Sequence, residues 1–455
     1  MARIFWFRRD RRLNDNLALN SCAKLAIRDG DKTVIPVFWF NEQDFESLSG
    51  IRQHSLTQSL IALDESLQQS LQVIASPDMS GLVEFANKHK VSFIHATESF
   101  DPEGIAEQRA LAAKLRGSGC ELILEDSYYA VKPGTVVKPT DGSAYRVYTP
   151  FYKAWFQIGW PSPVKLTKGF EWAKTKGSAK IPKPTKPSPI TVRAGEKFAL
   201  ETFKKFQKRA LHDYSENRNR ADLSGTSHLS HALAHGEIHP RTLLAELGDV
   251  EGHSVFRKEI AWREFYADVL FRNLHTIDDY YEPRFKLMRY DTGAKAKAKL
   301  ERWQQGQTGF PMVDAGMRQL LATGWMHNRV RMIVASFLVK DLHLEWQEGA
   351  KWFEQNLSDF DPASNSHGWQ WTAGCGTDAS PYYRVFNPIL QGYKFDPNGN
   401  YVRKYIPELS HLSGSQVHEP WILVDGLIHG YPEPMLDHGT ERDESLARLK
   451  EIKVE

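Results

Sequence analysis

Residues 359–371 read DFDPASNSHGWQW, and this run of two acids, a lone Asn and two Trp is the most informative stretch of the chain. Alone, Trp369 and Trp371 could be core residues, because Trp is highly buried on average. Residues two apart share a face in an extended segment, but point roughly 200° apart on a helical turn. We treat the stretch as a loop whose residue types suit a planar, redox-active cofactor beside an aromatic substrate.

Length and composition limit the number of domains, the partners and the compartment that can be expected. A chain of 455 residues exceeds the size at which one core keeps growing, so two domains are expected. A net charge of +2 neither demands nor excludes nucleic acid. Three widely spaced cysteines support neither a disulfide framework nor a zinc site, and they fit a reducing cytosol. Without a long apolar run or a signal-peptide pattern, the protein is expected to be soluble, intracellular and free of membrane.

The first 130 residues alternate between short apolar runs and segments of helical period such as Ile51–Gln69 and Pro102–Leu115. This alternation predicts a Rossmann-like α/β domain with a five-stranded parallel sheet. No GxGxxG or GxxxxGK[ST] motif follows the first strand, which argues against ordinary dinucleotide or P-loop chemistry. The expected strands are Arg3–Phe7, Thr33–Phe40, Leu71–Ile74, Val91–Ala96 and Glu121–Leu124.

The rest of the chain predicts a linker at 131–197 and an all-helical domain at 198–455. From Pro161 to Pro189 the sequence is rich in Pro and Lys, which favours a solvated tether over a DNA contact. The main segments of helical period beyond it are Ser254–Arg272, Ala294–Gln305, Val313–Leu342 and Trp346–Leu357.

One predicted helix has a mixed aromatic and charged face. Glu259, Trp262, Arg263 and Tyr266 follow the i, i+3, i+4, i+7 spacing that places side chains on one side of a helix. A surface helix with a Glu–Arg pair explains Arg263 as well as a binding site does. It explains Trp262 poorly.

Residues 324–332, GWMHNRVRM, form a second helical patch on which Asn328, Arg331 and Met332 share a face. An Asn amide can bind a base edge, and Met packs adaptably against flat rings. A helix of a DNA-binding protein could look the same. His327 is interpreted as a structural histidine, because no second ligand stands at HxxxH spacing.

Residues 226–230, TSHLS, stand directly before a run of helical period. Small hydroxyl side chains at a helix start are first of all capping residues. The same geometry leaves backbone N–H groups that can hold a phosphate. Taken alone, this signal is weak.

Together these strings resemble the DNA photolyase and cryptochrome family, and among its branches the class I cyclobutane pyrimidine dimer photolyases. The likeness spans nearly the whole chain. It rests on FWFRRDRRLNDNLAL, TSHLS, KEIAWREFY, TGFPMVDAGMRQLLATGWMHNRVRMIVASFLVKDL, and SNSHGWQW through TDASPYYRVFNP to PEL.

The resemblance implies an antenna domain at 1–130 and a helical domain that holds FAD, with FADH⁻ as the active form. It places Arg331 and Asp359 as an ion pair beside the flavin ring, Asp361 on the same edge and Asn365 at flavin N5. The FAD phosphates would be held by Tyr214, Thr226, Ser227, Leu229 and Ser230. His228 departs from the Arg that is commoner within TSHLS. No metal is required.

The same resemblance implies that the substrate is UV-damaged DNA, double- or single-stranded, with the pyrimidine dimer flipped out of the stack. Trp262 and Trp371 would contact the dimer, Glu259 a thymine, and Asn328 and Met332 the adenine and the dimer. Arg218 and Arg329 would bind DNA phosphates. In this arrangement Trp371 faces the DNA and Trp369 faces the flavin.

The implied enzyme is a deoxyribodipyrimidine photo-lyase, a carbon–carbon lyase in which blue light drives an electron from FADH⁻ to the dimer. The cyclobutane ring of the dimer then splits, and the electron returns to the flavin. The alternative is a cryptochrome photoreceptor. Against it stand Asn365, the intact Glu259, Trp262 and Trp371 set, and the lack of a long tail after Leu436. A six-four photolyase would carry His where this chain has Asn328 and Met332. A cytoplasmic, nucleoid-associated monomer is expected.

Two points depart from the family pattern or stay open. Trp369 and Trp346 match the first two members of the electron-transfer chain that photoreduces the flavin, but the third Trp aligns with Gly293. Tyr290 or Trp303 is expected to substitute. A second, antenna chromophore is expected, but residues 100–107, FDPEGIAE, do not reproduce a clear folate pattern. A folate, a deazaflavin, a second flavin and an empty site all remain open.

Overall fold

The computed structural model describes residues 3–175, 179–378 and 383–452. Contacts between Cα atoms divide the chain into unit 1, Met1–Arg209 with Ser227–Leu274, and unit 2, Ala210–Thr226 with His275–Glu455. This division differs from the expected domains 1–130, 131–197 and 198–455. The expected boundaries stay a prediction.

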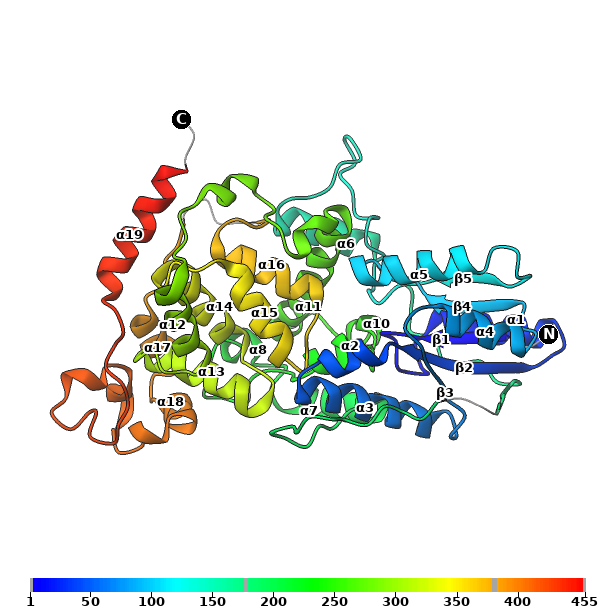
Figure 1. The fold of residues 1–455 in the computed structure, drawn as a ribbon, viewed down its shortest axis with the longest axis horizontal. Helices are drawn as coiled ribbons and strands as arrows, with labels where there is room; N and C mark the ends of the chain where they lie inside the picture. Colours follow the sequence, from blue (N-terminus) through cyan, green and yellow to red (C-terminus); the bar gives the residue numbers. More distant parts are fainter. Residues whose placement is uncertain (1–2, 176–178, 379–382, 453–455) are drawn as a thin grey trace. The chain divides into compact units, whose positions relative to one another are not determined.

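Unit 1 contains a parallel sheet with the strand order β3-β2-β1-β4-β5 (Figure 1). The five strands predicted from the apolar runs are confirmed within a few residues. A sixth, very short strand was missed, and it pairs in parallel with the first residues of β2. The strands are β1 Arg3–Phe7, β2 Thr33–Phe40, β3 Gln72–Ala75, β4 Phe93–Thr97, β5 Glu121–Glu125 and β6 Glu171–Trp172.

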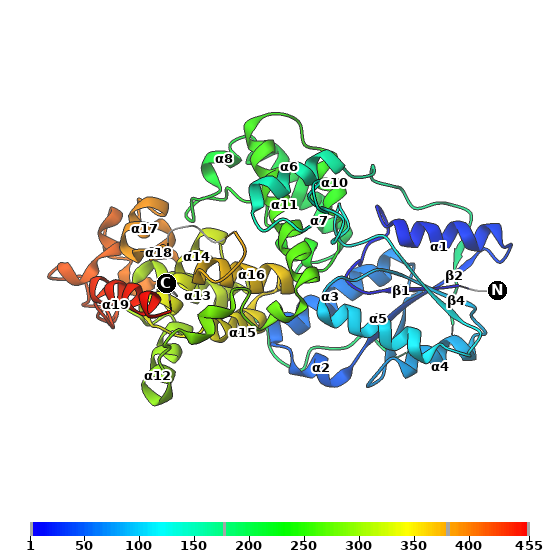
Figure 2. The same ribbon diagram turned by 90° about the horizontal axis from the view of Figure 1, so that it is seen from above.

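Helices cover both faces of this sheet, because successive side chains of a buried strand point to opposite faces. Phe5 and Phe7 pack with α1 and α3, whereas Ile4 and Trp6 pack with α4 and α5. Figure 2 shows α1 on one side of the strands and α4 and α5 on the other. These helices are α1 Leu17–Arg28, α2 Glu42–Ser47, α3 Gly50–Ser66, α4 Ser80–Lys88 and α5 Pro102–Lys114.

The Pro- and Lys-rich run is not a solvated tether. Besides forming β6, it binds α3 through hydrogen bonds from Thr57 Oγ1 to the Pro182 carbonyl oxygen, 2.9 Å, and from the Thr185 amide to Gln53 Oε1, 2.9 Å. Lys186 Nζ donates to the carbonyl oxygens of Glu46 and Leu48. Composition indicated a flexible segment, but its backbone and one of its lysines are fixed by polar partners on unit 1.

The later segments of unit 1 are helical and tied to the sheet by a buried ionic network. Arg241 donates to Asp15 Oδ1 at 3.1 Å and to both carboxylate oxygens of Asp126. Arg241 is 1% exposed, and the two carboxylates satisfy the charge that burial would otherwise penalise. These helices are α6 Tyr148–Ile158, α7 Glu196–Arg209, α9 Ser230–Ala234, α10 Pro240–Leu244 and α11 Glu251–Arg272.

The described part of unit 2 is helical throughout, as expected. Its α-helices are α8 Tyr214–Asn217, α12 Gly293–Gln304, α13 Pro311–Thr323, α14 Asn328–Ser336, α15 Trp346–Asn356, α16 Pro362–Ala373, α17 Pro388–Phe395, α18 Asn400–Tyr405 and α19 His438–Glu451. A π-helical turn, η3 Phe337–Asp341, continues α14, and the 3₁₀ turns are η1 Leu274–Ile277, η2 Pro283–Leu287, η4 Pro407–Leu409, η5 Gly414–His418 and η6 Pro420–Ile422.

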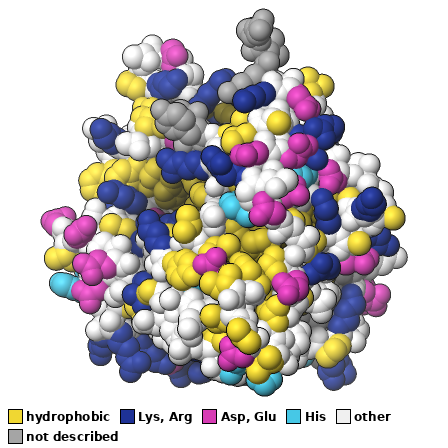
Figure 3. Space-filling model, turned by 90° about the vertical axis from the view of Figure 1, so that its left-hand side faces the viewer, with side chains coloured by type: hydrophobic (Ala, Val, Ile, Leu, Met, Phe, Trp, Pro, Cys, Tyr) yellow, Lys and Arg dark blue, Asp and Glu magenta, His cyan; other side chains and the backbone are white. Residues whose placement is uncertain are grey.

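The single helical pattern predicted from Val313 to Leu342 is broken in two. Gly324 ends α13 with φ 63°, a left-handed conformation that glycine adopts without steric cost. The core of unit 2 surrounds α13 to α16 and includes Trp303 and Trp346. Lys and Arg side chains border areas of hydrophobic side chains on the face of the molecule drawn in Figure 3. No helix in the described residues is long and apolar enough to cross a membrane.

Candidate functional site

Most of the stretch 359–371 is helical rather than a loop, because α16 begins at Pro362. Asp361 caps α16, its side chain accepting from the Ser364 amide, and Pro362 is the first helical residue. Trp369 is 3% exposed and packs against Phe353, while Trp371 is half-buried. Because both Trp residues lie on a helix and not on an extended segment, their side chains leave α16 in different directions.

Arg331 and Asp359 form the expected ion pair. Arg331 Nη2 lies 2.7 Å from Asp359 Oδ2, and Arg331 Nε donates to the Met326 carbonyl oxygen at 2.8 Å. The Asp359 side chain is fully buried, yet its second oxygen, Oδ1, has no hydrogen-bond partner among the described residues. An unpaired buried carboxylate oxygen costs free energy unless a donor completes it. The flavin ring carries such an N–H donor.

Asn365 lies on the first turn of α16, three residues from Pro362. Its amide nitrogen Nδ2 donates to the Ala350 carbonyl oxygen of α15 at 3.1 Å. This bond fixes the orientation of the amide and offers its oxygen to a ligand. The side-chain bond of Asp361 to the Ser364 amide gives that acid a capping role in addition to the expected one at the flavin edge.

Asn328 is the first residue of α14, and His327 caps this helix by accepting from the Arg329 amide at 3.2 Å. The interpretation of His327 as structural is confirmed. Arg329 is already engaged in unit 2: it donates to Asn219 Oδ1 at 2.7 Å and lies over the Phe395 ring at 4.6 Å. Its Nη1 also lies 3.6 Å from Met332 Sδ. Arg329 is thus held in place, with its guanidinium part-buried.

In unit 1 the predicted face of α11 is confirmed: Glu259, Trp262, Arg263 and Tyr266 are all half-buried. The indole of Trp262 is stacked on the Tyr148 ring of α6, with centroids 3.7 Å apart and planes 9° apart. Arg263 donates to the carbonyl oxygens of Tyr128 and Leu233, so it contributes to the fold of unit 1.

Residues 226–230, which are expected to bind the FAD phosphates, lead into the short helix α9. Helix α9 begins at Ser230 and ends at Ala234, and the Ser227 hydroxyl accepts from the Leu229 amide at 3.3 Å. His228, the departure from the family pattern, has φ 53°. Tyr214 begins α8 in unit 2, and the Arg218 guanidinium lies 5.9 Å from its ring centre. The N-cap of α9 is Leu229, with no side-chain cap hydrogen bond, so Ser227 is not the helix cap, and phosphate binding stays a prediction.

The residues expected to carry electrons lie in unit 2. The Trp303 ring is 6.1 Å from Trp369, fully buried, and its Nε1 donates to the Val334 carbonyl oxygen. Trp346 is 1% exposed, and its ring contacts the Tyr280 ring at a centroid distance of 6.2 Å. Tyr290 is half-buried and hydrogen-bonded to Tyr280. Tyr280 carries no signal in the sequence, because only folding brings it beside Trp346.

Unit 1 has a cavity of about 270 Å³ at the carboxyl ends of its strands, where ligands bind in open parallel sheets. Aromatic rings and arginines line it, and the stretch 99–107 contributes several of its polar groups. The pKa of Arg8 is raised by the nearby Tyr128, Glu107 and Asp101, which outweighs burial. Its lining includes Trp6, Arg8, Arg11, Trp39, Glu103 and Tyr128.

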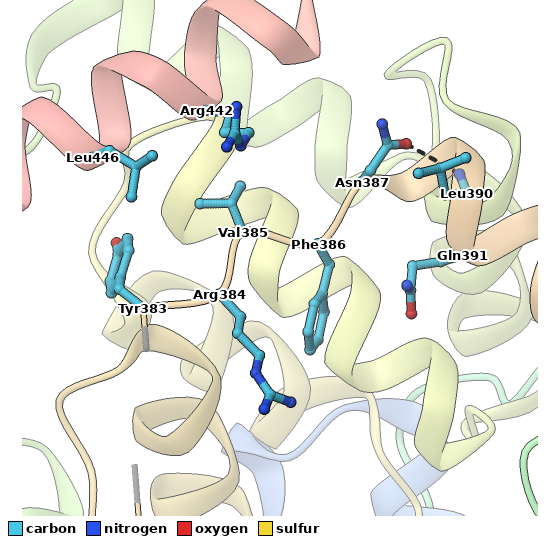
Figure 4. Close-up of a pocket in the computed structure, with 9 residues that line it drawn as sticks. All are labelled: Tyr383, Arg384, Val385, Phe386, Asn387, Leu390, Gln391, Arg442 and Leu446. Carbon is cyan, nitrogen blue, oxygen red and sulfur yellow. Dashed lines mark hydrogen bonds between the residues drawn. The ribbon is translucent and has the colours of Figure 1, made fainter. Parts of the chain in front are cut away.

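Unit 2 has a larger cavity, of about 510 Å³, between the segment that follows α16, the start of α17, and α19. Figure 4 shows Tyr383 beside Leu446 of α19, with Arg384 and Phe386 further along the same segment. None of the residues expected to bind flavin or DNA lines it. Residues 379–382, inside the TDASPYYRVFNP motif, lie outside the described part of the chain. The described residues bring together no group of metal-ligating side chains.

Fold and site define a flavoprotein with an α/β unit that has a ligand-sized cavity and a helical unit with a flavin-type ion pair. The family described as DNA photolyase matches residues 3–167, and the FAD binding domain of DNA photolyase matches residues 256–451. The deoxyribodipyrimidine photo-lyase of Agrobacterium fabrum is 38% identical over 99% of this chain and 98% of its own length. The chain belongs to the DNA photolyase family.

Solved structures agree with this assignment. A bacterial class III photolyase from Agrobacterium tumefaciens is 37% identical, with a TM-score of 0.88 and coverage of 99% of this chain and 97% of that one. The archaeal photolyase from Sulfolobus tokodaii with two FAD molecules is 27% identical, with a TM-score of 0.87 over 99% of this chain and all of the other. Because one of these is a class III enzyme, the expected closeness to class I stays a prediction.

Proposed function

We propose that this protein is a deoxyribodipyrimidine photo-lyase that uses blue light to split cyclobutane pyrimidine dimers in UV-damaged DNA. The observation that carries the proposal is the relative of that name, which matches 99% of the chain. The buried ion pair with an incomplete Asp359 oxygen supports it, because a flavin N–H supplies the missing donor. Bound FAD, reduced to FADH⁻, supplies the light-driven electron transfer.

The chain's own part in flavin binding is orientation and charge. Arg331 and Asp359 hold the ring edge, and Asp361 lies near the same edge while capping α16. Asn365, fixed by Ala350, presents a neutral amide oxygen to N5. Tyr214, Thr226, Ser227, Leu229 and Ser230 bind the phosphates through backbone and hydroxyl groups.

Binding of the damaged base relies on aromatic surface and on hydrogen bonds. In unit 1, Trp262 offers a flat face and Glu259 accepts from a thymine N–H. In unit 2, Asn328 and Met332 of α14 and Trp371 of α16 contact the flipped base. Arg218 and Arg329 bind phosphates, which makes affinity dependent on salt.

Photoreduction of oxidised flavin uses Trp369 and then Trp346, and its exit is Tyr290 rather than Trp303. Trp303 is fully buried between other buried rings, whereas Tyr290 is half-buried. Among the described residues, the rings that contact Trp303 are those of Phe353 and Trp369, both buried, so an electron hole on Trp303 has no exposed ring to move to. Gly293 itself has no ring, and among the described residues no atom beyond its chain neighbours and its own helix backbone lies within 4 Å of a Cβ built there.

The cavity of unit 1 holds a second chromophore that passes light energy to FAD. Its aromatic walls suit a flat ring, and its arginines suit an acidic or phosphate-bearing group. The photolyase with two FAD molecules makes a second flavin one candidate, beside a folate or a deazaflavin. Mass analysis of chromophores released from purified protein distinguishes the three. An Arg8→Ala protein that keeps its second chromophore would contradict the placement.

The protein is proposed to act as a cytoplasmic monomer that associates with the nucleoid by binding DNA. Light scattering of the flavin-loaded protein, with and without a short damaged duplex, is expected to give one copy per duplex. A stable dimer in both conditions would contradict this.

Light-dependent loss of dimers from UV-irradiated oligo-thymidine tests the function. The chemically reduced protein is expected to repair under blue light and not in the dark. A cryptochrome photoreceptor would instead bind FAD and respond to light without repair. Flavin content, measured in the same sample, separates a failed assignment from a failure to load cofactor.

A further inference from the structure

Tyr280 lies where an oxidised Trp346 needs an electron donor. The Tyr280 ring meets the Trp346 ring edge-on at a centroid distance of 6.2 Å and an angle of 89°. Both side chains are buried, Tyr280 at 3% and Trp346 at 1% exposure. Packed rings at this distance allow rapid electron transfer. Trp346 therefore has an oxidisable neighbour within unit 2.

Tyr280 stands in the middle of a hydrogen-bonded chain. Its phenol donates to Glu345 Oε1 at 3.3 Å. Burial raises the pKa of Tyr290, and the bond in which Tyr290 donates to Tyr280 adds to that rise. Burial also raises the pKa of Tyr280, and the bond from Tyr290 partly opposes the rise. Because the single phenol proton of Tyr280 is donated to Glu345, Tyr280 can only accept in its bond with Tyr290.

This order matters because an oxidised phenol is a very strong acid. A tyrosine gives up an electron readily only when its proton has somewhere to go at the same time. The buried phenols remain protonated at neutral pH, so each needs a neighbouring acceptor. Glu345 is exposed, and a carboxylate in water can take the proton and release it to solvent.

We propose that Tyr280 and Tyr290, with Glu345 as proton acceptor, form a redox relay that replaces the missing third Trp of this chain. The relay rests on the proposed function, whose photoreduction supplies an oxidised Trp346. Tyr280 gives one electron to Trp346 and its phenol proton to Glu345. The Tyr280 radical then takes one electron and one proton from Tyr290. The net result is a restored Trp346, a restored Tyr280, a proton on Glu345 and a neutral radical on Tyr290.

The half-buried Tyr290 is then where an external reductant, such as a thiol, returns the electron and the proton. Trp303 serves the relay poorly because its neighbours Phe353 and Trp369 are themselves buried. Tyr290 is therefore the last member of the tyrosine pair, and it does not exchange an electron directly with Trp346.

Electron paramagnetic resonance on illuminated, flavin-loaded protein tests the relay. In wild-type protein with ring-deuterated tyrosine, the signal is expected to narrow as a tyrosyl radical does. Tyr290→Phe should leave a tyrosyl radical on Tyr280, and Tyr280→Phe should lower the tyrosyl yield at least tenfold and leave a tryptophan radical. Glu345→Gln should slow decay of the Trp346 radical at least tenfold, because an amide cannot take the proton.

Tyr281→Phe is the matched control, since Tyr281 is adjacent in sequence and its ring meets His367. It should leave the radical unchanged. An unchanged tyrosyl yield in Tyr280→Phe, or a wild-type radical without any effect of tyrosine deuteration, would overturn the relay. Dimer repair by chemically reduced protein is measured in parallel. Its loss in wild-type protein would count against the proposed function, whereas a tyrosyl radical in the same sample would still support the relay.

Discussion

Trp262 is covered on one face by Tyr148, whose ring lies parallel to it at 3.7 Å. Tyr148 is itself fixed, because its phenol donates to the Lys258 carbonyl oxygen. A stacked, hydrogen-bonded support holds the indole in one orientation, and we expect the face opposite Tyr148 to receive the ligand. Tyr148 is thus a positioning residue for the surface proposed to receive the pyrimidine dimer.

Removing that support should weaken recognition of damage. Tyr148→Ala leaves Trp262 free to rotate, and we expect its affinity for a dimer-containing duplex to fall about tenfold, the equivalent of about 1.4 kcal/mol. Affinity for undamaged DNA should hardly change. Tyr148→Phe keeps the ring and is the control. Equal loss in both variants, measured by fluorescence anisotropy, would show that the phenol hydroxyl matters and the stack does not.

The Arg331–Asp359 pair should control flavin retention. Asp359→Asn leaves Arg331 without its charge partner, at a cost of about 2–3 kcal/mol because Arg331 is partly exposed. We expect flavin content, read from visible absorbance against protein, to drop at least fivefold. Glu408→Gln breaks another pair of unit 2, with Arg318, and should leave flavin content unchanged. Flavin loss of the same size in Glu408→Gln would mean that stability alone sets retention.

Gly349 is required by its contact with Trp369. A Cβ at this position of α15 would stand 2.1 Å from the indole ring, so Gly349→Ala should destabilise the protein by about 1–3 kcal/mol. Displacement of Trp369 should also slow photoreduction. Gly368 on α16 has nothing within 4 Å of such a Cβ, and Gly368→Ala should be neutral or stabilising. Urea unfolding compares the two; equal destabilisation would refute the contact as the cause.

Lys340 should make stability depend on pH. Burial lowers its pKa from 10.5 to about 7, although Nζ donates to the Arg384 carbonyl oxygen at 2.6 Å. Between pH 7 and 10.5 the unfolded chain holds a proton on this amine that the folded chain lacks. Stability therefore rises with pH across this window and reaches its low plateau below it.

Lys340→Met should abolish that rise and gain about 1–3 kcal/mol near neutral pH, the removed charge outweighing the lost hydrogen bond. Urea unfolding near pH 7 and near pH 10 measures both effects. Lys351→Met changes an exposed lysine and should leave the pH dependence of the wild type intact. A variant at Lys340 with the wild-type pH profile would show that this amine is charged in the folded protein.

The sequence predicted elements whose cause is local. The strands of unit 1 are continuous apolar runs, as expected of strands buried on both faces, and the face of α11 follows from helical spacing. Strand β6 could not be found this way, since two residues in a Pro- and Lys-rich run carry no periodicity. Its pairing with β2 is a tertiary effect.

The helical form of α16 was missed although its start signal was present. Asp361 followed by Pro362 is an N-cap and first-turn pattern, but Asn, Ser, His and Gly are weak helix formers and suggested a loop. The site residues were identified by resemblance rather than by spacing. The Tyr148–Trp262 stack and the Tyr280–Glu345 hydrogen bond join residues more than sixty positions apart, and no local pattern predicts such contacts.

The central claim is light-driven reversal of pyrimidine dimers, and recovery of thymine absorbance in irradiated oligo-thymidine measures it most directly. With chemically reduced, flavin-loaded protein the ultraviolet absorbance of thymine should return under blue light and stay flat in the dark. Glu259→Gln, with equal flavin content, should repair at least tenfold more slowly, because an amide replaces the carboxylate proposed to orient the thymine by accepting its N–H. No recovery of absorbance under light, from wild-type protein with its flavin bound and reduced, would contradict the account.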